Sequence, residues 1–198
     1  MVALGETIRR FDIPPEPFLN LLTAFEQDQR VKQYDTFEQL LGYCRNSANP
    51  VGHLVLYLFE CFDAERAALA DEVCTGLQLA NFWQDVARDF AIGRVYIPGE
   101  DRRRFGYPDE DLEARRFTSA FAELMRFEVE RTRGLFARGL PLADRVNRRV
   151  AREVRMFASG GLTILERLEQ SGYSPVERRP RLSARDKLRL LRLGLVGA

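Results

Sequence analysis

Asn81-Phe-Trp-Gln-Asp-Val-Ala-Arg-Asp89 places Asn81, Asp85 and Asp89 at intervals of four residues. In an α-helix, residues four apart fall on nearly one face and drift by about 40° per step. From residue 73 to residue 90 the only charged side chains are Asp85, Arg88 and Asp89, and apolar side chains cover most of the circumference. A helix that is apolar nearly all round is usually buried. The stretch therefore predicts a buried helix with an amide and two carboxylates along one stripe. We call these three residues, Asn81, Asp85 and Asp89, the ladder.

Two carboxylates on a buried helix need partners, because an unpaired buried charge is very costly. Oxygen ligands from Asp and Asn suit Mg²⁺, which typically takes one or two protein carboxylates and completes its shell with water and substrate phosphate. One interpretation is a magnesium–diphosphate site formed by Asn81, Asp85 and Asp89. The alternative is that Arg88 pairs with Asp85 or Asp89, while Asn81 caps local backbone.

The composition narrows the class of protein. The 198 residues suffice for one domain with a real core. The 30 Lys and Arg against 29 Asp and Glu give a net charge of +1, so we expect no nucleic-acid partner. The three cysteines form no C-x-x-C pair, which is typical of a reduced, cytoplasmic chain. Neither a membrane-spanning run nor a secretory signal is visible.

Helical periodicity dominates the sequence, so we expect one all-α domain over residues 1–198 with at least six helices. The predicted helices span about 16–29, 36–48, 64–90, 118–138 and 142–170, and residues 54–62 are apolar enough to be core. Glycine and proline breakers predict a loop over 93–107. Within it, Asp101-Arg-Arg-Arg104 is interpreted as solvated, or as flanking the mouth of a site.

The C-terminal segment 183–198 is predicted to be a basic amphipathic helix. Ser183 and Asp186 have the spacing of a capping box. Apolar and basic side chains then share the helix, namely Leu188, Leu191 and Leu195 beside Arg185, Lys187, Arg189 and Arg192. Such a helix can lie on an anionic membrane surface or dock on its own domain. Peripheral membrane contact therefore stays open.

Tyr43 and Arg94 are further candidates for a site. Tyr43 precedes the helix break expected at Pro50, so it lines a cavity or is a core tyrosine with a satisfied hydroxyl. Arg45 faces either a phosphate or a surface acid. Arg94 follows the predicted ladder helix directly and can approach a diphosphate held there. The only histidine, His53, makes a histidine-based metal or triad site improbable.

Three blocks in this order and spacing resemble the squalene and phytoene synthase family. They are the tyrosine segment 43–52, the 78–89 region with its two aspartates, and Gly93-Arg-Val-Tyr-Ile-Pro98. Within the first block, the sequence Ser-Ala-Asn-Pro-Val-Gly most resembles that of the bacterial hydroxysqualene synthases of the hopanoid pathway. The resemblance runs from about Phe11 to the C-terminus.

The resemblance implies an all-α isoprenoid synthase (terpenoid synthase-like) helical bundle with a central cavity. It implies Mg²⁺-dependent ionisation of a prenyl diphosphate: presqualene diphosphate to hydroxysqualene, or head-to-head condensation of farnesyl diphosphate. The implied roles are metal binding for Asn81, Asp85 and Asp89, catalysis for Tyr43, Asp85 and Asp89, and substrate binding for Arg45, Gln84, Arg94 and Tyr96.

The sequence also departs from the family pattern. The first aspartate-rich motif of the family should lie upstream of Phe11, so the chain resembles the C-terminal two-thirds of a synthase without its N-terminal helices. We therefore expect the 198 residues alone to be inactive or poorly stable. Gln84 stands where many members carry Arg, and Gly160-Gly161 where some carry tyrosine.

Three other functions stay open. One is a presqualene diphosphate or phytoene synthase of the same family. Another is a non-catalytic helical assembly module, which the missing motif favours and the two acids on a buried helix oppose. The third is a class I terpene cyclase, which shares the ladder chemistry but not the Tyr43 block. The expected location is the cytoplasm, or the inner face of the membrane if the C-terminal helix makes contact there.

Overall fold

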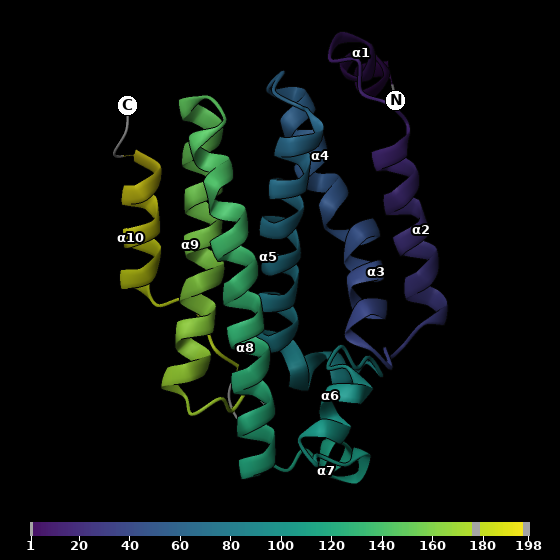
Figure 1. The fold of residues 1–198 in the computed structure, drawn as a ribbon, viewed down its shortest axis with the longest axis vertical. Coiled ribbons are helices and arrows are strands. Elements are labelled where there is room, and N and C mark those ends of the chain that lie inside the picture. The colour runs from purple at the N-terminus through teal and green to yellow at the C-terminus, as the bar shows by residue number, and fades with distance from the viewer. Residues whose placement is uncertain (1, 176–178, 196–198) are drawn as a thin grey trace.

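The structure is a computed structural model that describes residues 2–175 and 179–195, with side chains up to residue 190. In these ranges the regular structure is helical, with one isolated bridge between Gln33 and Val95. The elements, drawn in Figure 1, are α1 (Val2–Arg10), α2 (Glu16–Arg30), α3 (Phe37–Ser47), α4 (Asn49–Leu58), α5 (Ala64–Ala91), α6 (Gly99–Arg104), α7 (Asp109–Glu113), α8 (Ser119–Gly139), the 3₁₀ helix η1 (Leu140–Asp144), α9 (Arg148–Gln170) and α10 (Ala184–Leu195).

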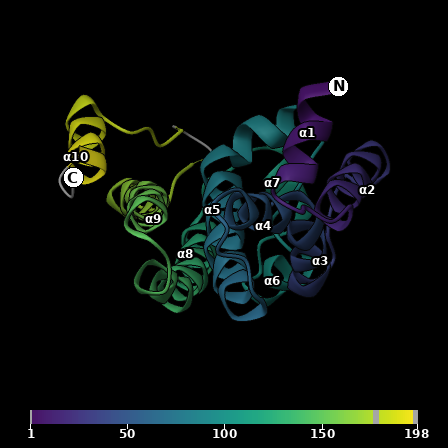
Figure 2. The same cartoon turned by 90° about the horizontal axis from the view of Figure 1, so that it is seen from above.

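The helix that carries the ladder, α5, runs through the middle of the molecule. It lies between α8 and α9 on one side and α3 and α4 on the other (Figures 1 and 2). Asp63 caps its start by accepting a hydrogen bond from the amide of Arg66 at 2.7 Å, and Gly93, with φ of 75°, follows its end. Trp83 is fully buried and donates to Thr132 of α8 at 2.8 Å. The predicted buried helix over 64–90 is confirmed.

Two glycines allow the long helices to approach closely. A Cβ on Gly139 would lie 2.7 Å from a methyl carbon of Val73 on α5. A Cβ on Gly161 of α9 would lie 2.5 Å from the ring of Phe136 on α8. These distances leave no room for a side chain. The packing of α8 on α5 therefore depends on Gly139, and the packing of α9 on α8 depends on Gly161.

The segment after α5 is fastened to the α2–α3 connection by backbone hydrogen bonds. The amide of Val95 donates to Lys32 at 2.7 Å, and the amide of Gly99 donates to Tyr34 at 3.0 Å. Residues distant in sequence are thereby held side by side. Arg94 and Tyr96 lie next to the end of α2, which positions them for the site described below.

The prediction of a loop over 93–107 is wrong for residues 99–104, which form α6. The breakers flank this helix instead of interrupting it, since Pro98 is its N-cap and Gly106 follows it. Asp101 is buried and accepts two hydrogen bonds from Arg131 of α8, at 2.9 and 3.0 Å. Arg102 is also buried and pairs with Asp109. These two side chains are therefore structural ties, not solvated groups.

Two other predicted boundaries need correction. The predicted helix over 142–170 is divided into η1 and α9, and α9 begins after Asn147, whose side chain accepts from the amide of Val150. In the region 54–62, predicted as core, Leu56 is buried but Val55, Leu58 and Phe62 are exposed. Val55 and Leu58 lie within α4 on a side that the described residues do not cover, and Phe62 follows the end of that helix.

The C-terminal helix α10 packs against the outer side of α9 (Figure 2). The predicted cap is confirmed: the amide of Ser183 donates to Asp186 at 2.7 Å, and the amide of Asp186 donates to the Ser183 hydroxyl at 3.2 Å. Asp186 also accepts from Arg167 of α9 at 2.7 Å. The predicted positions Leu191, Arg192 and Leu195 lie where side chains are not described. No helix in the described ranges is long and apolar enough to cross a membrane.

Candidate active site

The three polar residues of the 81–89 stretch lie on α5 as predicted, but they differ in exposure. Asp85 is buried, at 6% exposure, Asp89 is half-buried and Asn81 is exposed. The middle residue of the stripe is therefore the most buried, and both ends are more accessible to solvent. The electrostatic surroundings of the two carboxylates also differ.

Asp85 is paired with Arg179, from the segment between α9 and α10. Arg179 donates through Nε and Nη2 to the two carboxylate oxygens, with 3.0 Å between Nη2 and Oδ2. Such fork-shaped pairs are strong and specific in geometry. The predicted alternative of an Arg88–Asp85 pair is not formed, and Arg88 is exposed.

Asp89 has a carboxylate oxygen that lacks a partner. Its Oδ2 is buried and meets no hydrogen-bond donor among the described residues. Burial raises the pKa of Asp89 to about 6, and the negative charge of Asp85 adds to the rise, against the opposing effect of Arg94. A buried polar atom without a partner is costly. Of the two acids on this stripe, Asp89 is therefore the one for which a bound cation brings the larger gain.

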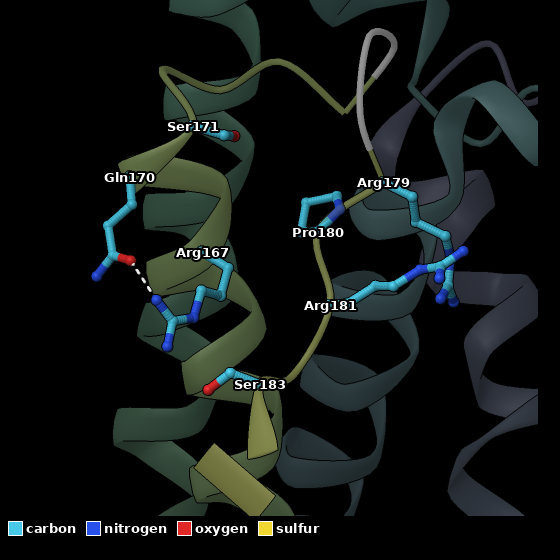
Figure 3. A pocket seen from close by; sticks show the side chains of 7 residues that line it. All are labelled: Arg167, Gln170, Ser171, Arg179, Pro180, Arg181 and Ser183. Carbon is cyan, nitrogen blue, oxygen red and sulfur yellow. Dashed lines mark hydrogen bonds between the residues drawn. The ribbon is translucent and has the colours of Figure 1, made fainter. Parts of the chain in front are cut away.

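The segment 179–182 forms one wall of a cavity of about 610 Å³ beside α5. It is fastened to α5 by Gln84, which donates to the carbonyl of Pro180 at 2.6 Å. Figure 3 shows the side chains of Arg179 and Arg181 extending to the same side of the segment, away from Arg167. The cavity has a polar edge of Asn81, Gln84, Arg179 and Arg181, and an apolar lining that includes Leu77, Phe157, Ile164, Leu182 and Leu190. Asn81 thus lies at the polar edge of an apolar cavity, and Asp85 is joined to that edge through Arg179.

Tyr43 belongs to a group of four packed aromatic rings. Its ring centroid lies 5.6 Å from Tyr34, 6.1 Å from Tyr96 and 6.2 Å from Phe82. Phe82 and Tyr96 stack face to face with centroids 3.7 Å apart. Of the two alternatives for Tyr43, the structure shows a buried tyrosine with a satisfied hydroxyl.

The aromatic group and the ladder meet at a second, small cavity. Phe82, Asp89, Arg94 and Tyr96 all line it. Arg94 donates to the Tyr96 hydroxyl at 3.3 Å. The structure therefore brings four predicted residues, Tyr43, Asp89, Arg94 and Tyr96, into one neighbourhood.

Asp28, near the end of α2, is a site residue that the sequence did not reveal. Its Oδ1 accepts from the Tyr43 hydroxyl at 2.9 Å, and its Oδ2 lies 3.6 Å from Arg94. In sequence it is one of several charged residues on a mostly exposed helix face. One feature of the sequence could have indicated Asp28. It stands one helical turn after Ala24, which is buried against the core, so both residues lie on the same side of α2.

Arg45 and His53 lie outside this neighbourhood. Arg45 pairs with Glu38 at the surface and lines a separate cavity with Arg138 and Glu130. Of its two predicted partners, phosphate or surface acid, this structure shows the acid. His53 has its Nε2 2.8 Å from Asp71 on the face of α4.

The donor atoms of the ladder fit a hard divalent cation such as Mg²⁺. Asp89 offers a buried oxygen without a donor, and Asn81 offers an amide oxygen. Asp85 can bind a cation through these oxygens only if Arg179, which donates to both of them, moves away. Among the described side chains, no cluster of three or more His, Cys, Asp or Glu residues is placed to hold a metal. Two carboxylates are nevertheless what Mg²⁺ usually takes from a protein.

Comparison with solved structures places this helical architecture in the isoprenoid synthase class. The structure matches squalene synthase HpnC from Alicyclobacillus acidocaldarius with a TM-score of 0.86 and 46% identity, over 87% of this chain and 66% of that one. A dehydrosqualene synthase solved with a ligand matches with a TM-score of 0.85 and 25% identity, over 96% of this chain and 67% of that one. The predicted all-α fold class is confirmed.

The chain belongs to the squalene/phytoene synthase family, whose sequence profile matches residues 1–186. A hydroxysqualene synthase from Rhodopseudomonas palustris is 33% identical over 147 residues, which are 73% of this chain and 50% of that protein. A phytoene synthase from Thermus thermophilus is 32% identical over 95% of this chain and 64% of its own length. The chain thus spans about half the length of the hydroxysqualene synthases that it matches.

Proposed function

We propose that this chain binds a prenyl diphosphate and promotes its Mg²⁺-dependent ionisation, as a synthase of the squalene/phytoene type. The observation that carries this proposal is the position of the ladder. Asn81 lines the polar edge of a largely apolar cavity, and Asp85 reaches that edge through its pair with Arg179. Asp89, with a buried oxygen that meets no donor among the described residues, lies in the adjoining small cavity with Arg94. A prenyl diphosphate has a matching division into an apolar chain and an anionic head.

The residues of the chain have separable tasks in this reaction. Asn81, Asp85 and Asp89 would hold the metal, which supplies positive charge to the leaving diphosphate. Arg94 lies beside Asp89 in the small cavity and can orient diphosphate oxygens. Gln84 holds the 179–182 segment as a wall of the larger cavity.

The cation left after diphosphate departure must be protected from water until rearrangement is complete. The apolar lining of the large cavity would help to keep water from a bound prenyl chain. Phe82 and Tyr96 line the small cavity beside Asp89, and aromatic side chains at such a position can stabilise a nearby cation. Tyr43 packs behind them and would assist in rearrangement or proton handling.

For the substrate, we propose presqualene diphosphate ionised to hydroxysqualene, within the hopanoid pathway. Two observations support this substrate. One is the sequence Ser47-Ala-Asn-Pro-Val-Gly52, and the other is the similarity to proteins named hydroxysqualene synthase and squalene synthase HpnC. Head-to-head condensation of farnesyl diphosphate, to presqualene diphosphate or onward, is the alternative within the same site. Phytoene synthases among the relatives extend that alternative to longer prenyl chains.

The test is release of diphosphate from each candidate substrate. The 198-residue chain, and the same chain extended by N-terminal helices that carry the first aspartate-rich motif, are each incubated with Mg²⁺ and presqualene or farnesyl diphosphate, and diphosphate and organic products are measured. The variants below are made in whichever of the two releases diphosphate. We expect Asp89→Asn and Asp85→Asn to abolish release, while Glu72→Gln, an acid elsewhere on α5, leaves it unchanged. Release that is equal in Asp89→Asn and the unaltered chain contradicts the proposal.

The second candidate function is a non-catalytic helical assembly module. The Asp85–Arg179 pair favours it, because one ladder acid is already neutralised within the protein. Calorimetric titration with an unreactive farnesyl thiodiphosphate separates the two. Binding that requires Mg²⁺ and is lost in Asp89→Asn excludes a pure scaffold, and the absence of any binding favours one.

We further propose that the protein is cytoplasmic and that α10 makes peripheral contact with an anionic membrane. Arg185, Lys187 and Arg189 are exposed, and Leu188 is 52% exposed on the same helix. The test is sedimentation with vesicles of phosphatidylglycerol against vesicles of phosphatidylcholine. Binding that favours the anionic vesicles and falls in Arg185→Gln/Lys187→Gln supports contact. Equal partitioning to both vesicles, or to neither, contradicts it.

A further inference from the structure

We propose that Asp28 is a positioning residue for Tyr43, whose hydroxyl hydrogen it holds, so that the Tyr43 oxygen acts as a fixed negative end of a dipole behind the aromatic wall of the site. The inference rests on the function proposed above and deepens it. It begins from a single contact, the hydrogen bond of 2.9 Å from the Tyr43 hydroxyl to Asp28 Oδ1. A hydroxyl has one hydrogen to donate and two lone pairs to accept with. With its hydrogen held by Asp28, the Tyr43 oxygen offers lone pairs alone to any other group.

The carboxylate of Asp28 is itself held from several directions. Its second oxygen lies 3.6 Å from Arg94, and Lys32 donates to the Asp28 backbone carbonyl at 2.7 Å. The side chain is 24% exposed, so it is mostly shielded from solvent. Tyr43 of α3 and Arg94 of the segment after α5 therefore orient the two carboxylate oxygens, while Lys32 ties the backbone of the residue that bears them.

The surroundings keep Tyr43 neutral. Burial raises the pKa of the Tyr43 phenol, and the hydrogen bond to Asp28 raises it further, followed by the nearby Tyr96 and Tyr34. A neutral phenol bonded to a carboxylate is polarised, so its oxygen carries additional negative charge. Such a fixed dipole stabilises a developing cation in a site that excludes water. A phenolate, in contrast, would be a nucleophile able to trap the cation.

The position of Tyr43 relative to the ladder fits this role. Its ring packs on Phe82 and Tyr96, which line the cavity that also contains Asp89 and Arg94. Diphosphate would depart toward Asp89 and Arg94. The cation would remain against Phe82 and Tyr96, and the Tyr43 oxygen, held by Asp28 behind these rings, would add negative charge to that wall.

The first measurement reads the hydrogen bond without turnover. Tyrosine labelled with ¹³C at Cζ gives six signals in this chain, and Tyr43→Phe assigns the signal of Tyr43. We expect Asp28→Asn to shift that signal. Glu26→Gln, an exposed acid on the same helix, is the matched control and leaves it in place. An unmoved Tyr43 signal in Asp28→Asn overturns the inference.

The second measurement reads the effect on a cation. Farnesyl dimethylammonium, a stable cationic analogue, is titrated calorimetrically in the presence of Mg²⁺ and diphosphate. We expect Asp28→Asn and Tyr43→Phe each to weaken binding about tenfold, and the double variant to lose no more than either alone. Additive losses mean that Asp28 acts through its own charge, and they overturn the inference, as does absence of binding to the unaltered chain. Asp28→Ser serves in place of Asp28→Asn if the latter is unfolded by circular dichroism.

Turnover separates this inference from the proposed function. If the unaltered chain releases diphosphate, we expect Asp28→Asn to lower kcat with KM little changed, because the cation exists only after ionisation begins. A loss confined to KM overturns the inference. If the unaltered chain releases none, the proposed function fails on its own, while the labelled signal and the ammonium titration still decide the role of Asp28.

Discussion

At the scale of single residues, Asp85 and Asp89 stand one helical turn apart in opposite situations. Arg179 neutralises Asp85, whereas Asp89 has a buried oxygen without a donor and a pKa raised to about 6 from 3.8. The folded protein therefore holds a proton at Asp89 more tightly than the unfolded chain does. The resulting stabilisation is present below about pH 4 and is lost as the pH rises through about 6.

We expect Asp89→Asn to stabilise the metal-free protein at pH 7.5 by about 1–2 kcal/mol and to change little at pH 4. The reason is that asparagine cannot ionise, so the cost of a buried negative charge disappears. Urea unfolding in EDTA at both pH values measures the difference. Glu123→Gln, an exposed acid on α8, is the control. A stabilisation of equal size at pH 4 and pH 7.5 contradicts this explanation.

Arg179 competes with any cation for the oxygens of Asp85. We expect Arg179→Gln to strengthen Mg²⁺ binding by roughly three- to tenfold, since the cation no longer has to displace a two-point ion pair on a partly exposed arginine. Calorimetric titration with Mg²⁺ measures it. Arg181→Gln removes the same charge from the same segment without breaking the Asp85 pair. An equal gain in both variants would show that net charge, not the pair, governs affinity.

At the scale of elements, the sequence predicted helices that depend on local interactions better than helices and contacts that depend on residues far apart in the chain. Helix α5 was predictable because a long apolar run with a local cap defines it. Helix α6 was missed because six residues between breakers carry almost no periodicity, and its stability comes from Asp101 and Arg131, 30 positions apart. The partner of Asp85 lies 94 positions away, and Asp28 meets Tyr43 only after α2 and α3 pack. The spacing of residues in the sequence was enough to locate the ladder. The contacts of Asp85 and Tyr43 could not be predicted, because they form only when distant segments pack together.

Adjacent glycines on α9 give a matched test of helix packing. A Cβ on Gly161 would lie 2.5 Å from Phe136, whereas a Cβ on Gly160 meets only Leu190 at 3.9 Å. We expect Gly161→Ala to destabilise the protein by about 1–3 kcal/mol through overpacking. Gly160→Ala should stabilise it by up to about 1 kcal/mol through helix propensity. Urea unfolding of both variants is the measurement, and effects of the same sign would show that α8 and α9 are not in close contact there.

At the scale of the whole molecule, the ladder and the C-terminal helix are parts of one connected structure. Arg179 and the Pro180 carbonyl bind α5, and a few residues later Asp186 binds Arg167 on α9. The segment 179–183 therefore bridges the acids of α5 and the helix on the outer side of α9 (Figure 2). Any change in the partner of Asp85 must reach this segment.

We expect Mg²⁺ without substrate to increase hydrogen exchange in the segment 179–183, read at the amide of Ser183, which donates to Asp186. The reason is that a cation at Asp85 and Asp89 displaces Arg179 and frees one end of the segment. Mass spectrometry of exchange with and without Mg²⁺ measures this. Asp85→Asn should show fast exchange in both conditions, since its side chain no longer forms the charged pair. The amides of α8 near Thr132 serve as an internal reference, because Trp83 and Thr132 are fully buried there. Protection of 179–183 that stays constant at Mg²⁺ concentrations shown by calorimetry to saturate the protein would mean that the cation binds without displacing Arg179.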